Sequence, residues 1–379
     1  MNTNPTYFYR LGHSPDFGVA EYEILTGDKP TKRSPSYILA GKELNVNITG
    51  SLVFGGIVHH SWASKPSLDD VKETLRTLWP TIIGDTKKVG LSLFGIKSTV
   101  KEMIQLAKDL GGKKVNVIFE SPAFGHWKQT KNWLMLLEIA GGWHLGLVQS
   151  FCNQEFWSKL DSSFPAGDMA RGLINLKLAR TLVNFSTTSK VIDPFAGAGR
   201  LLVAGMDRKS EMAATDIDAD CYMETRLNWD YGDYFFGRNY HFLNNGEYKP
   251  AKMAFNQTLD ATALETLTEL DGPNTSLVTE GYLGTNFRQK PKLEEIQKEF
   301  QVLQAIWNKV LTAAAKVKLA EIVFCLPAYS NQQLILPDFL DDMVNRSDYK
   351  FELLANQKHL IYARKDSLVS HLVIKLVRK

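Results

Sequence analysis

Residues 191–202, "VIDPFAGAGRLL", carry the strongest indication of how this chain folds. A short apolar run ends at Asp193, turns through Pro194 and enters a loop that contains Gly197 and Gly199. Glycines let a ligand approach the backbone closely, and a helix that starts after the loop offers free N–H groups. The segment therefore predicts a ligand-binding loop between a buried strand and a helix.

Short apolar segments follow this loop, separated by stretches with helical periodicity. Parallel strands that are buried on both faces read as such apolar runs. Two alternating segments at 359–365 and 370–379, joined by a polar turn, predict a closing antiparallel hairpin. We therefore expect an α/β fold with a doubly wound Rossmann-like domain that ends in this hairpin. The expected strands lie at residues 189–195, 211–217, 251–257, 276–280 and 320–326.

Length and composition divide the chain into regions. A chain of 379 residues exceeds the usual size of one compact core, so two or three domains are expected. Residues 1–150 alternate short strands and helices as an α+β region does, and residues 150–172 are rich in small, polar, glycine and proline residues. This change predicts an N-terminal α+β region at 1–150 and the Rossmann-like domain at 151–379.

Composition narrows the class of protein. A content of 44% hydrophobic and 22% charged residues is ordinary for a globular protein, and a net charge of +3 excludes a polycationic tail but allows a local basic face. No run reaches the roughly 20 apolar residues that span a bilayer, so no membrane association is expected. The three cysteines lack C-x-x-C spacing and the eight histidines lack H-x-x-x-H spacing, so we expect no metal site and a cytoplasmic location.

The loop at 191–202 differs from a dinucleotide-binding loop, which reads G-x-G-x-x-G. Leu202 stands where the third glycine would be, and the strand ends in D-P-F. The D-P-F-x-G-x-G pattern resembles the S-adenosylmethionine loop of class I methyltransferases, in which the acid helps to hold the amino-acid end of the cofactor. The resemblance implies cofactor contacts at Asp193, Pro194, Gly197 and Gly199. A structural tight turn and another nucleotide ligand are the alternatives.

Two further acids follow the next two strands. Asp216 ends the second strand, 17 residues after Gly199, where a doubly wound fold places an acid that binds ribose hydroxyls. Asp218 is expected to cap the following helix instead. Asp260 follows the third strand, where it can accept a hydrogen bond from an adenine amine, and it equally fits the N-cap of a helix that starts at Ala261. The two roles of Asp260 are compatible.

The end of the fourth strand, residues 276–284 or "SLVTEGYLG", brings an acid and a ring to the same edge. Methyltransferases that modify an exocyclic base amine commonly read N/D-P-P-Y/F here. A carboxylate or amide and a backbone carbonyl orient the amine toward the sulfonium methyl, and the ring stacks on the base. We therefore expect Glu280, Gly281 and Tyr282 to form the catalytic group, although both prolines are missing. In a gapless alignment the stacking ring falls on Leu283.

Several segments, in this order, resemble the THUMP-containing tRNA guanosine N2-methyltransferases: 164–185, 191–202, 278–284 and 359–379. The resemblance is clear from about residue 143 to the end. It is weaker in the N-terminal half, which is similar to a ferredoxin-like segment followed by a THUMP-like RNA-binding domain. In the first segment the family's pattern is carried by Pro165, Asp168, Met169, Gly172, Leu173, Lys177, Leu178 and Ala179.

The resemblance implies a methyltransferase that uses S-adenosylmethionine, acts on tRNA or structured RNA and methylates the N2 amine of a guanosine. Some members of that family act with a small activating subunit, which would be a further partner. The chain departs from the family's pattern at Gly167 (arginine), Ile174 and Asn175 (two prolines) and Arg200 (a small hydroxyl residue). These departures cluster where the base and the RNA would bind.

Two other functions fit the same motifs. A DNA amino-methyltransferase shares D-P-F-x-G-x-G, but the region 1–150 has the place and size of an RNA-binding module rather than a DNA-recognition insert. A catalytically impaired RNA-binding member of the fold is the other alternative. Glycine in place of proline after Glu280 frees the backbone that would otherwise fix a carbonyl toward the amine.

Overall fold

The computed structural model describes residues 5–83, 88–93, 95–96, 100–111, 116–119, 132–167, 173–243, 247–268, 270–285, 287, 289–331, 333–363 and 367–379. The chain forms two compact units. The N-terminal unit comprises Met1–Pro15, Thr26–Asn47 and Leu52–Cys152, and the C-terminal unit comprises Asp16–Leu25, Ile48–Ser51 and Asn153–Lys379. Helix α1 (Pro15–Thr26) thus groups with the C-terminal unit, although it lies near the start of the chain.

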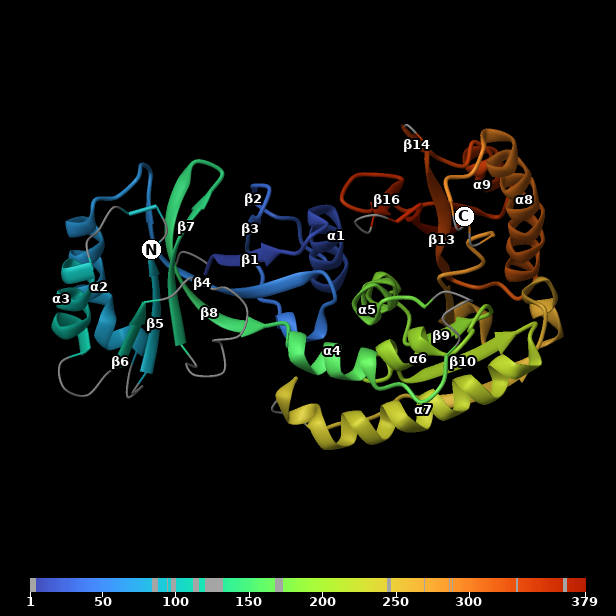
Figure 1. Ribbon diagram of the computed structural model, residues 1–379, viewed down its shortest axis with the longest axis horizontal. Helices are drawn as coiled ribbons and strands as arrows, with labels where there is room; N and C mark the ends of the chain where they lie inside the picture. Colours follow the sequence, from blue (N-terminus) through green and yellow to red (C-terminus); the bar gives the residue numbers. More distant parts are fainter. Residues whose placement is uncertain are drawn as a thin grey trace. The chain divides into compact units, whose positions relative to one another are not determined.

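The N-terminal unit contains an eight-stranded sheet (Figure 1). Strand β5 runs parallel to β6 and β7, and the other neighbouring strands are antiparallel. Helices α2 (Leu68–Ile83) and α3 (Val100–Gly111) pack against the β5 side of the sheet. The sheet order is β2 (Lys32–Arg33), β3 (Tyr37–Ala40), β1 (Tyr7–Leu11), β4 (Leu52–Trp62), β8 (Gly142–Phe151), β7 (Asn132–Ile139), β5 (Lys88–Leu93), β6 (Asn116–Phe119).

Helix α2 shows how local sequence sets these elements. The Asp70 N–H donates to Ser67 Oγ at 3.1 Å, and the Asp70 carboxylate accepts from the Ser67 N–H at 2.8 Å. This reciprocal pair satisfies N–H groups that a helix start leaves unpaired. Val71 and Leu75, one turn apart, are fully buried on the face that meets the sheet. The helix therefore begins at its own serine–aspartate cap and presents an apolar face to the sheet.

The C-terminal unit contains a nine-stranded sheet. Its first five strands are parallel, and β17 then pairs antiparallel with β13, β15 and β16. Chain order reverses between β9 and β12, which is the switch point where doubly wound sheets bind ligands. The expected doubly wound sheet with a closing hairpin is confirmed. The order is β11 (Lys252–Thr258), β10 (Glu211–Asp216), β9 (Lys190–Asp193), β12 (Thr275–Val278), β13 (Glu321–Asn331), β17 (Val369–Arg378), β15 (Tyr349–Phe351), with β14 (Gln333–Ile335) on β13 and β16 (His359–Tyr362) on β17.

Helices cover both faces of this sheet. On one face α8 (Leu293–Lys316) packs with α9 (Leu340–Arg346) around one large apolar core, and Figure 1 shows α8 near β13. The other helices include α4 (Gln154–Ser162), α5 (Leu176–Phe185), α6 (Arg200–Gly205) and α7 (Ala219–Asn239), with α7 along β10 and β11. Short 3-10 turns lie at Val46–Ile48, Tyr240–Phe242, Ala261–Thr266 (η5) and Gly272–Asn274. Among the described residues, no helix has the length and apolar character of a membrane span.

Helix α8 is amphipathic. Ile296, Phe300, Leu303, Trp307 and Val310 recur every three or four positions and are buried against the sheet. Burial of each such side chain contributes roughly 1.5–3 kcal/mol. The helix is thereby held firmly beside the carboxyl end of β12.

Candidate active site

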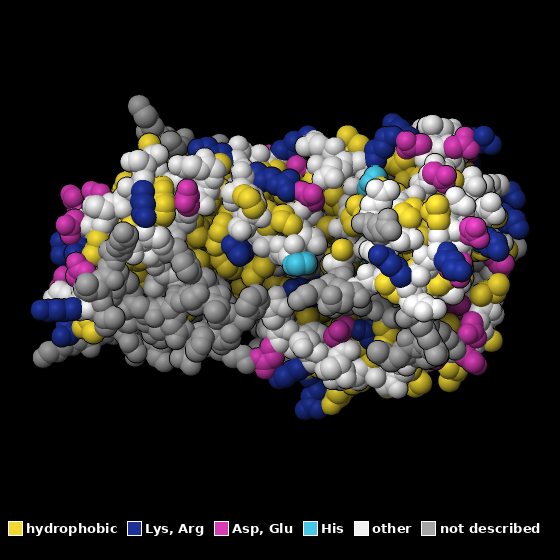
Figure 2. Space-filling view, turned by 45° about the horizontal axis from the view of Figure 1, so that its top comes forward, with side chains coloured by type: hydrophobic (Ala, Val, Ile, Leu, Met, Phe, Trp, Pro, Cys, Tyr) yellow, Lys and Arg dark blue, Asp and Glu magenta, His cyan; other side chains and the backbone are white. Residues whose placement is uncertain are grey.

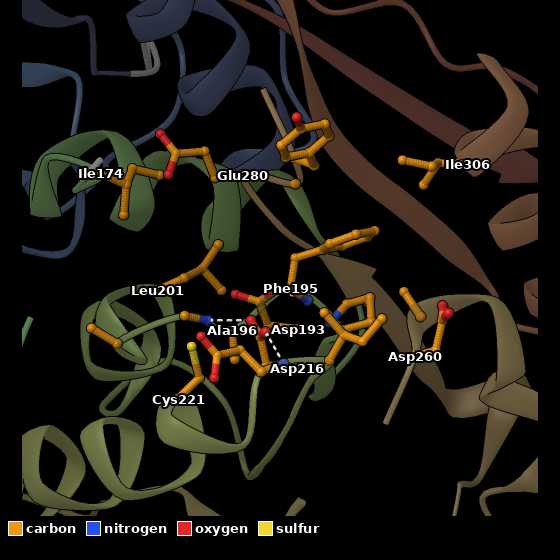
Figure 3. Close-up of a pocket in the computed structure, with 18 of the residues that line it drawn as sticks. Ile174, Asp193, Phe195, Ala196, Leu201, Asp216, Cys221, Asp260, Glu280 and Ile306 are labelled. Carbon is orange, nitrogen blue, oxygen red and sulfur yellow. Dashed lines mark hydrogen bonds between the residues drawn. The ribbon is translucent and has the colours of Figure 1, made fainter. Parts of the chain in front are cut away.

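The carboxyl ends of β9, β10 and β12 border a cavity of about 740 Å³ in the C-terminal unit. The strand order reverses at this point, so the chain segments that follow β9 and β12 pass to opposite faces of the sheet. A space therefore remains between them. Figure 3 shows Asp193 and Asp216 on one side of this opening, Asp260 to one end, and Glu280 across from them. Eight of the nine residues expected to act in binding or catalysis line the cavity: Asp193, Pro194, Gly197, Asp216, Asp260, Glu280, Gly281 and Tyr282.

Gly199, the ninth residue, is not part of the cavity wall and is the N-cap of α6. Gly197 and Gly199 have φ angles of 50° and 74°, in the left-handed region that favours glycine. A Cβ on Gly199 would lie 2.9 Å from Thr225 Cγ2. Thr225, on α7, also donates its hydroxyl to the Gly197 carbonyl at 2.9 Å. The two glycines thus allow the loop to turn and to pack directly on α7.

Asp193 ends β9 and is only 2% exposed. Its Oδ1 accepts the Phe195 N–H at 3.1 Å. Burial, with smaller contributions from the Asp216 and Glu280 carboxylates, raises the pKa of Asp193 to about 7, although hydrogen bonds from the Thr279 hydroxyl and the Phe195 N–H act in the opposite direction. A cation in the cavity would stabilise the ionised form, so Asp193 is arranged to respond to a positively charged ligand.

Asp216, at the end of β10, supports the glycine loop from below. Its Oδ2 accepts the Gly197 N–H at 2.8 Å, and its Oδ1 accepts the Asp218 N–H at 3.0 Å. A carboxylate offers about four acceptor positions, so these two bonds leave capacity for ligand hydroxyls. Asp218 caps α7 by accepting the Asp220 N–H at 3.0 Å, as expected from the sequence.

Asp260 has the capping position that the sequence allowed. Its Oδ1 accepts the Thr262 N–H at 2.8 Å at the start of η5. The same side chain lines the cavity together with Ala261 and Thr262. The cap fixes the carboxylate on the wall, and this position is compatible with a contact to a ligand amine.

The end of β12 forms a turn that differs from the proline motif. Thr279 Oγ1 accepts the Gly281 N–H at 2.9 Å, and Gly281 has a φ of 72°. Proline holds φ near −65° and has no N–H, so it cannot replace Gly281 in this turn. A Cβ at this position would also lie 3.0 Å from Trp307 Cζ2. The glycine after Glu280 is therefore required by this backbone.

The ring beside the cavity belongs to Tyr282 rather than to residue 283. Tyr282 lines the cavity and is 40% exposed. The Leu283 carbonyl accepts a hydrogen bond from Tyr329 at 3.2 Å, and Leu283 is not part of the cavity wall. Of the two residues, Tyr282 is the one that lies on the cavity wall beside Glu280 and Gly281.

Arg200, a departure from the family's pattern, has a structural role. Its Nε donates to the Ile174 carbonyl at 3.0 Å, and its guanidinium forms an ion pair with Asp161. The guanidinium also lies 4.7 Å from the centre of the Phe164 ring. These contacts hold the segment that carries Ile174 against the cavity wall. Asp168, Met169 and Gly172, which carry part of the family resemblance, lie outside the described residues.

Asn228 is a buried contact that sequence reasoning missed. Its side-chain nitrogen donates to the carbonyls of Ala166 and Ala198 at 2.9 and 2.8 Å. Its side-chain oxygen accepts the Ala166 N–H at 3.1 Å. Asn228 lies one turn after Thr225 on α7, so one face of this helix holds both the glycine loop and the preceding segment. A polar pair with helical spacing was the only sign of it in the sequence.

The charge of the cavity wall favours a cationic ligand. Acids outnumber bases on the wall, and the base Arg200 is already paired with Asp161. A phosphate-rich ligand would be repelled, whereas a sulfonium or ammonium group would be attracted. Within the described residues, no cluster of three or more His, Cys, Asp or Glu side chains could hold a metal ion. The acids are Asp193, Asp216, Asp218, Glu224, Asp260 and Glu280, and the bases are Arg200 and Lys309.

The charged side chains of the surface are mixed in sign. On the face drawn in Figure 2, lysine and arginine side chains alternate with acidic ones among the described residues and do not form one continuous patch. This distribution agrees with the low net charge of +3. The local basic face that the net charge allows is therefore not seen among the described residues on this face of the molecule.

Comparison with known proteins supports the fold. No family model matches the sequence, and no curated protein matches it. Among solved structures, TrmN from Thermus thermophilus is similar over 99% of this chain and 100% of its own, with 11% identity and a TM-score of 0.50. A protein described as a possible methylase from Clostridium difficile 630 is similar over 100% of this chain and 99% of its own, with 12% identity and a TM-score of 0.46. At such identities the similarity to TrmN shows that the fold is shared over the whole chain.

Proposed function

We propose that this chain is an S-adenosylmethionine-dependent methyltransferase that modifies the N2 amine of a guanosine in tRNA. The observation that carries the proposal is the meeting of two motifs at one cavity. The D-P-F-x-G-x-G loop after β9 and the acid–glycine–tyrosine turn after β12 line the same 740 Å³ space. That volume lies in the range of about 300–1,000 Å³ typical of small-molecule sites.

The acids on the wall fit the three parts of the cofactor. Asp193 lies at the base of the glycine loop, where it would bind the ammonium group of the amino-acid end. Asp216 would accept from the ribose hydroxyls and Asp260 from the adenine amine. S-adenosylmethionine, when bound, supplies a methyl group on a positively charged sulfur. The excess of acids around the cavity favours that positive charge over a phosphate ligand.

Glu280 and Tyr282 would act on the acceptor base. The Glu280 carboxylate would accept a hydrogen bond from the exocyclic amine and so direct the nitrogen lone pair toward the methyl group. Tyr282, exposed at the rim, would stack on the base once it leaves its own stack. Transfer forms a nitrogen–carbon bond while the sulfur keeps the electron pair of the broken bond, and Glu280 receives the proton that the amine loses. The chain thus contributes orientation and removal of water.

The RNA substrate is proposed from the family resemblance and from the arrangement of the chain. The N-terminal unit is a separate α+β body of the place and size expected for an RNA-binding module. The full-length similarity in fold to TrmN supports an enzyme built in the same way. A DNA amino-methyltransferase remains the second enzymatic candidate because it shares the cofactor loop.

A binding protein without turnover is favoured by one observation, the left-handed φ of 72° at Gly281. The two prolines of the family's motif hold a carbonyl toward the amine, and this turn cannot contain the first of them. The loss of that rigid carbonyl would reduce the rate unless another group holds Glu280 in place.

Incubation of the purified protein with methyl-labelled S-adenosylmethionine and bulk tRNA tests the proposal. Label in tRNA, recovered as N2-methylguanosine by nucleoside mass spectrometry and lost with Glu280→Ala, is the expected result. Label in DNA but not in tRNA would favour the DNA enzyme. Cofactor binding by calorimetry without transfer to either nucleic acid, with or without added cell extract, would favour the binding protein.

A further inference from the structure

Glu280 has one close side-chain partner in the described residues, and it comes from the last strand of the chain. His371 Nε2 lies 2.6 Å from Glu280 Oε1, across 91 positions of sequence. The imidazole is 9% exposed and the carboxylate 24% exposed. His371 does not line the cavity, so it reaches the site only through Glu280.

We propose that His371 is a positioning residue, which holds the Glu280 carboxylate toward the acceptor amine by donating its Nε2–H to Oε1. The inference rests on the proposed function and deepens it, because it assigns a role to a residue outside both motifs. The turn after Glu280 lacks the two prolines of the family's motif and contains Gly281 in a left-handed conformation. The contact with His371 gives the Glu280 carboxylate a rigid support that this turn does not provide.

The sheet fixes His371 from both sides. On β17 it lies opposite Pro327 of β13 and Tyr362 of β16, within regular antiparallel ladders. The Tyr362 ring meets the imidazole edge to face, with centroids 6.0 Å apart and an interplanar angle of 71°. A side chain on a central strand with neighbours on both sides has little freedom, whereas Glu280 follows the end of its strand in a turn. The hydrogen bond to this fixed imidazole therefore restricts the movement of the Glu280 carboxylate.

The surroundings of the other imidazole nitrogen favour one tautomer. His371 Nδ1 is buried and has no hydrogen-bond partner among the described residues. A protonated imidazolium would leave a buried N–H unpaired at Nδ1, which is unfavourable. The neutral ring with its proton on Nε2 satisfies the short contact and leaves Glu280 ionised. Oε2 of Glu280 is then the oxygen that accepts from the amine and takes its proton after transfer.

A matched pair of amide variants tests whether a hydrogen-bond donor at the position of His371 Nε2 is needed. The side-chain nitrogen of His371→Gln extends about as far as Nε2, whereas that of His371→Asn extends only as far as Nδ1. We expect kcat within about 3-fold of wild type for His371→Gln. For His371→Asn we expect kcat to fall about 10–100-fold, the size expected for a lost hydrogen bond to a charged group. The KM for tRNA and the Kd for S-adenosylhomocysteine should stay unchanged in both variants.

Equal losses in the two amide variants, or a loss in KM rather than kcat, would overturn the inference. A double variant separates this role from a general packing defect. Adding His371→Asn to Glu280→Gln should lower kcat no further, because the carboxylate that His371 holds is already gone. A fully additive loss in the double variant would also overturn it. Thermal unfolding of each variant shows that the comparison concerns folded protein.

A second measurement keeps this inference separate from the proposed function. In protein labelled with ¹⁵N-histidine, the His371 signals are assigned by their loss in His371→Gln. We expect a proton on Nε2, and a shift of that proton's resonance in Glu280→Gln. A proton on Nδ1, or no response to Glu280→Gln, would refute the positioning role even if methyl transfer is seen. Failure of the wild-type protein to transfer methyl, with the expected spectrum, would refute the function and leave the contact established.

Discussion

Asp193 shows at the scale of one residue how burial prepares a side chain for a ligand. The fold places its carboxyl at the end of a central strand, where burial raises its pKa to about 7. Its ordinary value is 3.8, so at neutral pH the folded chain without ligand holds a partly protonated acid. A carboxyl of this kind destabilises the fold at neutral pH, and a cation bound beside it would offset that destabilisation.

The first prediction concerns Asp193→Asn. Because the folded-state pKa is raised, the carboxyl's favourable contribution is full below about pH 4 and is lost as pH rises to about 7. The side-chain oxygen of the asparagine can still accept the Phe195 N–H, but the amide does not ionise, so the variant does not lose stability as pH rises. We expect the variant to gain on the order of 4 kcal/mol at pH 8, a rise of about 8–16 °C in Tm, and to gain little at pH 4. Its affinity for S-adenosylmethionine should fall at least about 10-fold in calorimetry.

An unchanged Tm at pH 8, or wild-type cofactor affinity, would contradict this assignment of Asp193. The matched control is Asp218→Asn, a nearby acid on the same wall whose main contact is the cap of α7. Asparagine is an equally good N-cap, so this control should change neither the stability nor its dependence on pH.

The second prediction concerns Gly281→Pro, which restores one proline of the family's motif. Proline cannot adopt a φ of 72° and cannot donate the hydrogen bond that Thr279 Oγ1 now accepts. We expect a loss of about 3 kcal/mol, a fall of about 6–12 °C in Tm, and no gain in methyl transfer. Gly237→Ala, in an open position on α7, is the control and should leave Tm unchanged or slightly raised. A Gly281→Pro variant with wild-type Tm would show that the turn differs from the one described.

At the scale of elements, helix α7 organises one side of the site. Its Thr225 binds the Gly197 carbonyl, and its Asn228 binds backbone groups of Ala166 and Ala198. Both residues point from one face of the helix toward the loop, one turn apart. The helix therefore links the loop after β9 to the segment that precedes α5.

The third prediction is that Asn228→Ala weakens both stability and cofactor binding. The change leaves partly buried backbone groups of Ala166 and Ala198 without their partner, which costs about 2–3 kcal/mol. We expect Tm to fall by about 5–10 °C and the Kd for S-adenosylmethionine to rise about 10-fold. Arg226→Ala on the same helix removes only an exposed ion pair with Asp230 and should change Tm by less than about 1 °C. Equal effects of the two variants would show that Asn228 has no special role.

At the scale of the whole molecule, chain order and spatial grouping differ. Helix α1 is part of the C-terminal unit, and its Glu21 is fully buried there. Glu21 accepts the N–H groups of Gly50 and Ser51 and the Asn184 side chain, at 2.7–2.8 Å. Phe17 of the same helix stacks on Phe185. Residues near the start of the chain thus complete the core that carries the site.

The fourth prediction follows from this grouping. A fragment that contains only residues 151–379 lacks α1 and exposes the apolar face of α5 that α1 covers. We expect this fragment to unfold at least about 10 °C below the corresponding transition of the full chain, measured by circular dichroism. The full chain with the conservative change Phe17→Leu is the control and should lose much less. An independent, equally stable fragment with normal cofactor affinity would contradict the role of α1.

Features that depend only on local pattern could be predicted before the fold was known. Apolar runs predicted the parallel strands, and the acids at strand ends predicted which side chains meet at one edge. The caps at Asp218 and Asp260 could also be predicted, because a cap depends on its own few residues. Since the carboxyl ends of parallel strands share one edge, correct strands were enough to bring Asp193, Asp216 and Glu280 together.

Features that depend on contacts between distant residues became known only from the assembled fold. The partner of Glu280 is 91 positions away on a strand whose neighbours local pattern does not specify. The grouping of α1, the contacts of Asn228 and the raised pKa of Asp193 likewise depend on what packs around them. The left-handed turn at Gly281 also became known only with its backbone. Periodicity records which face of an element is buried, but the identity of the atoms that bury it is set by the assembled fold.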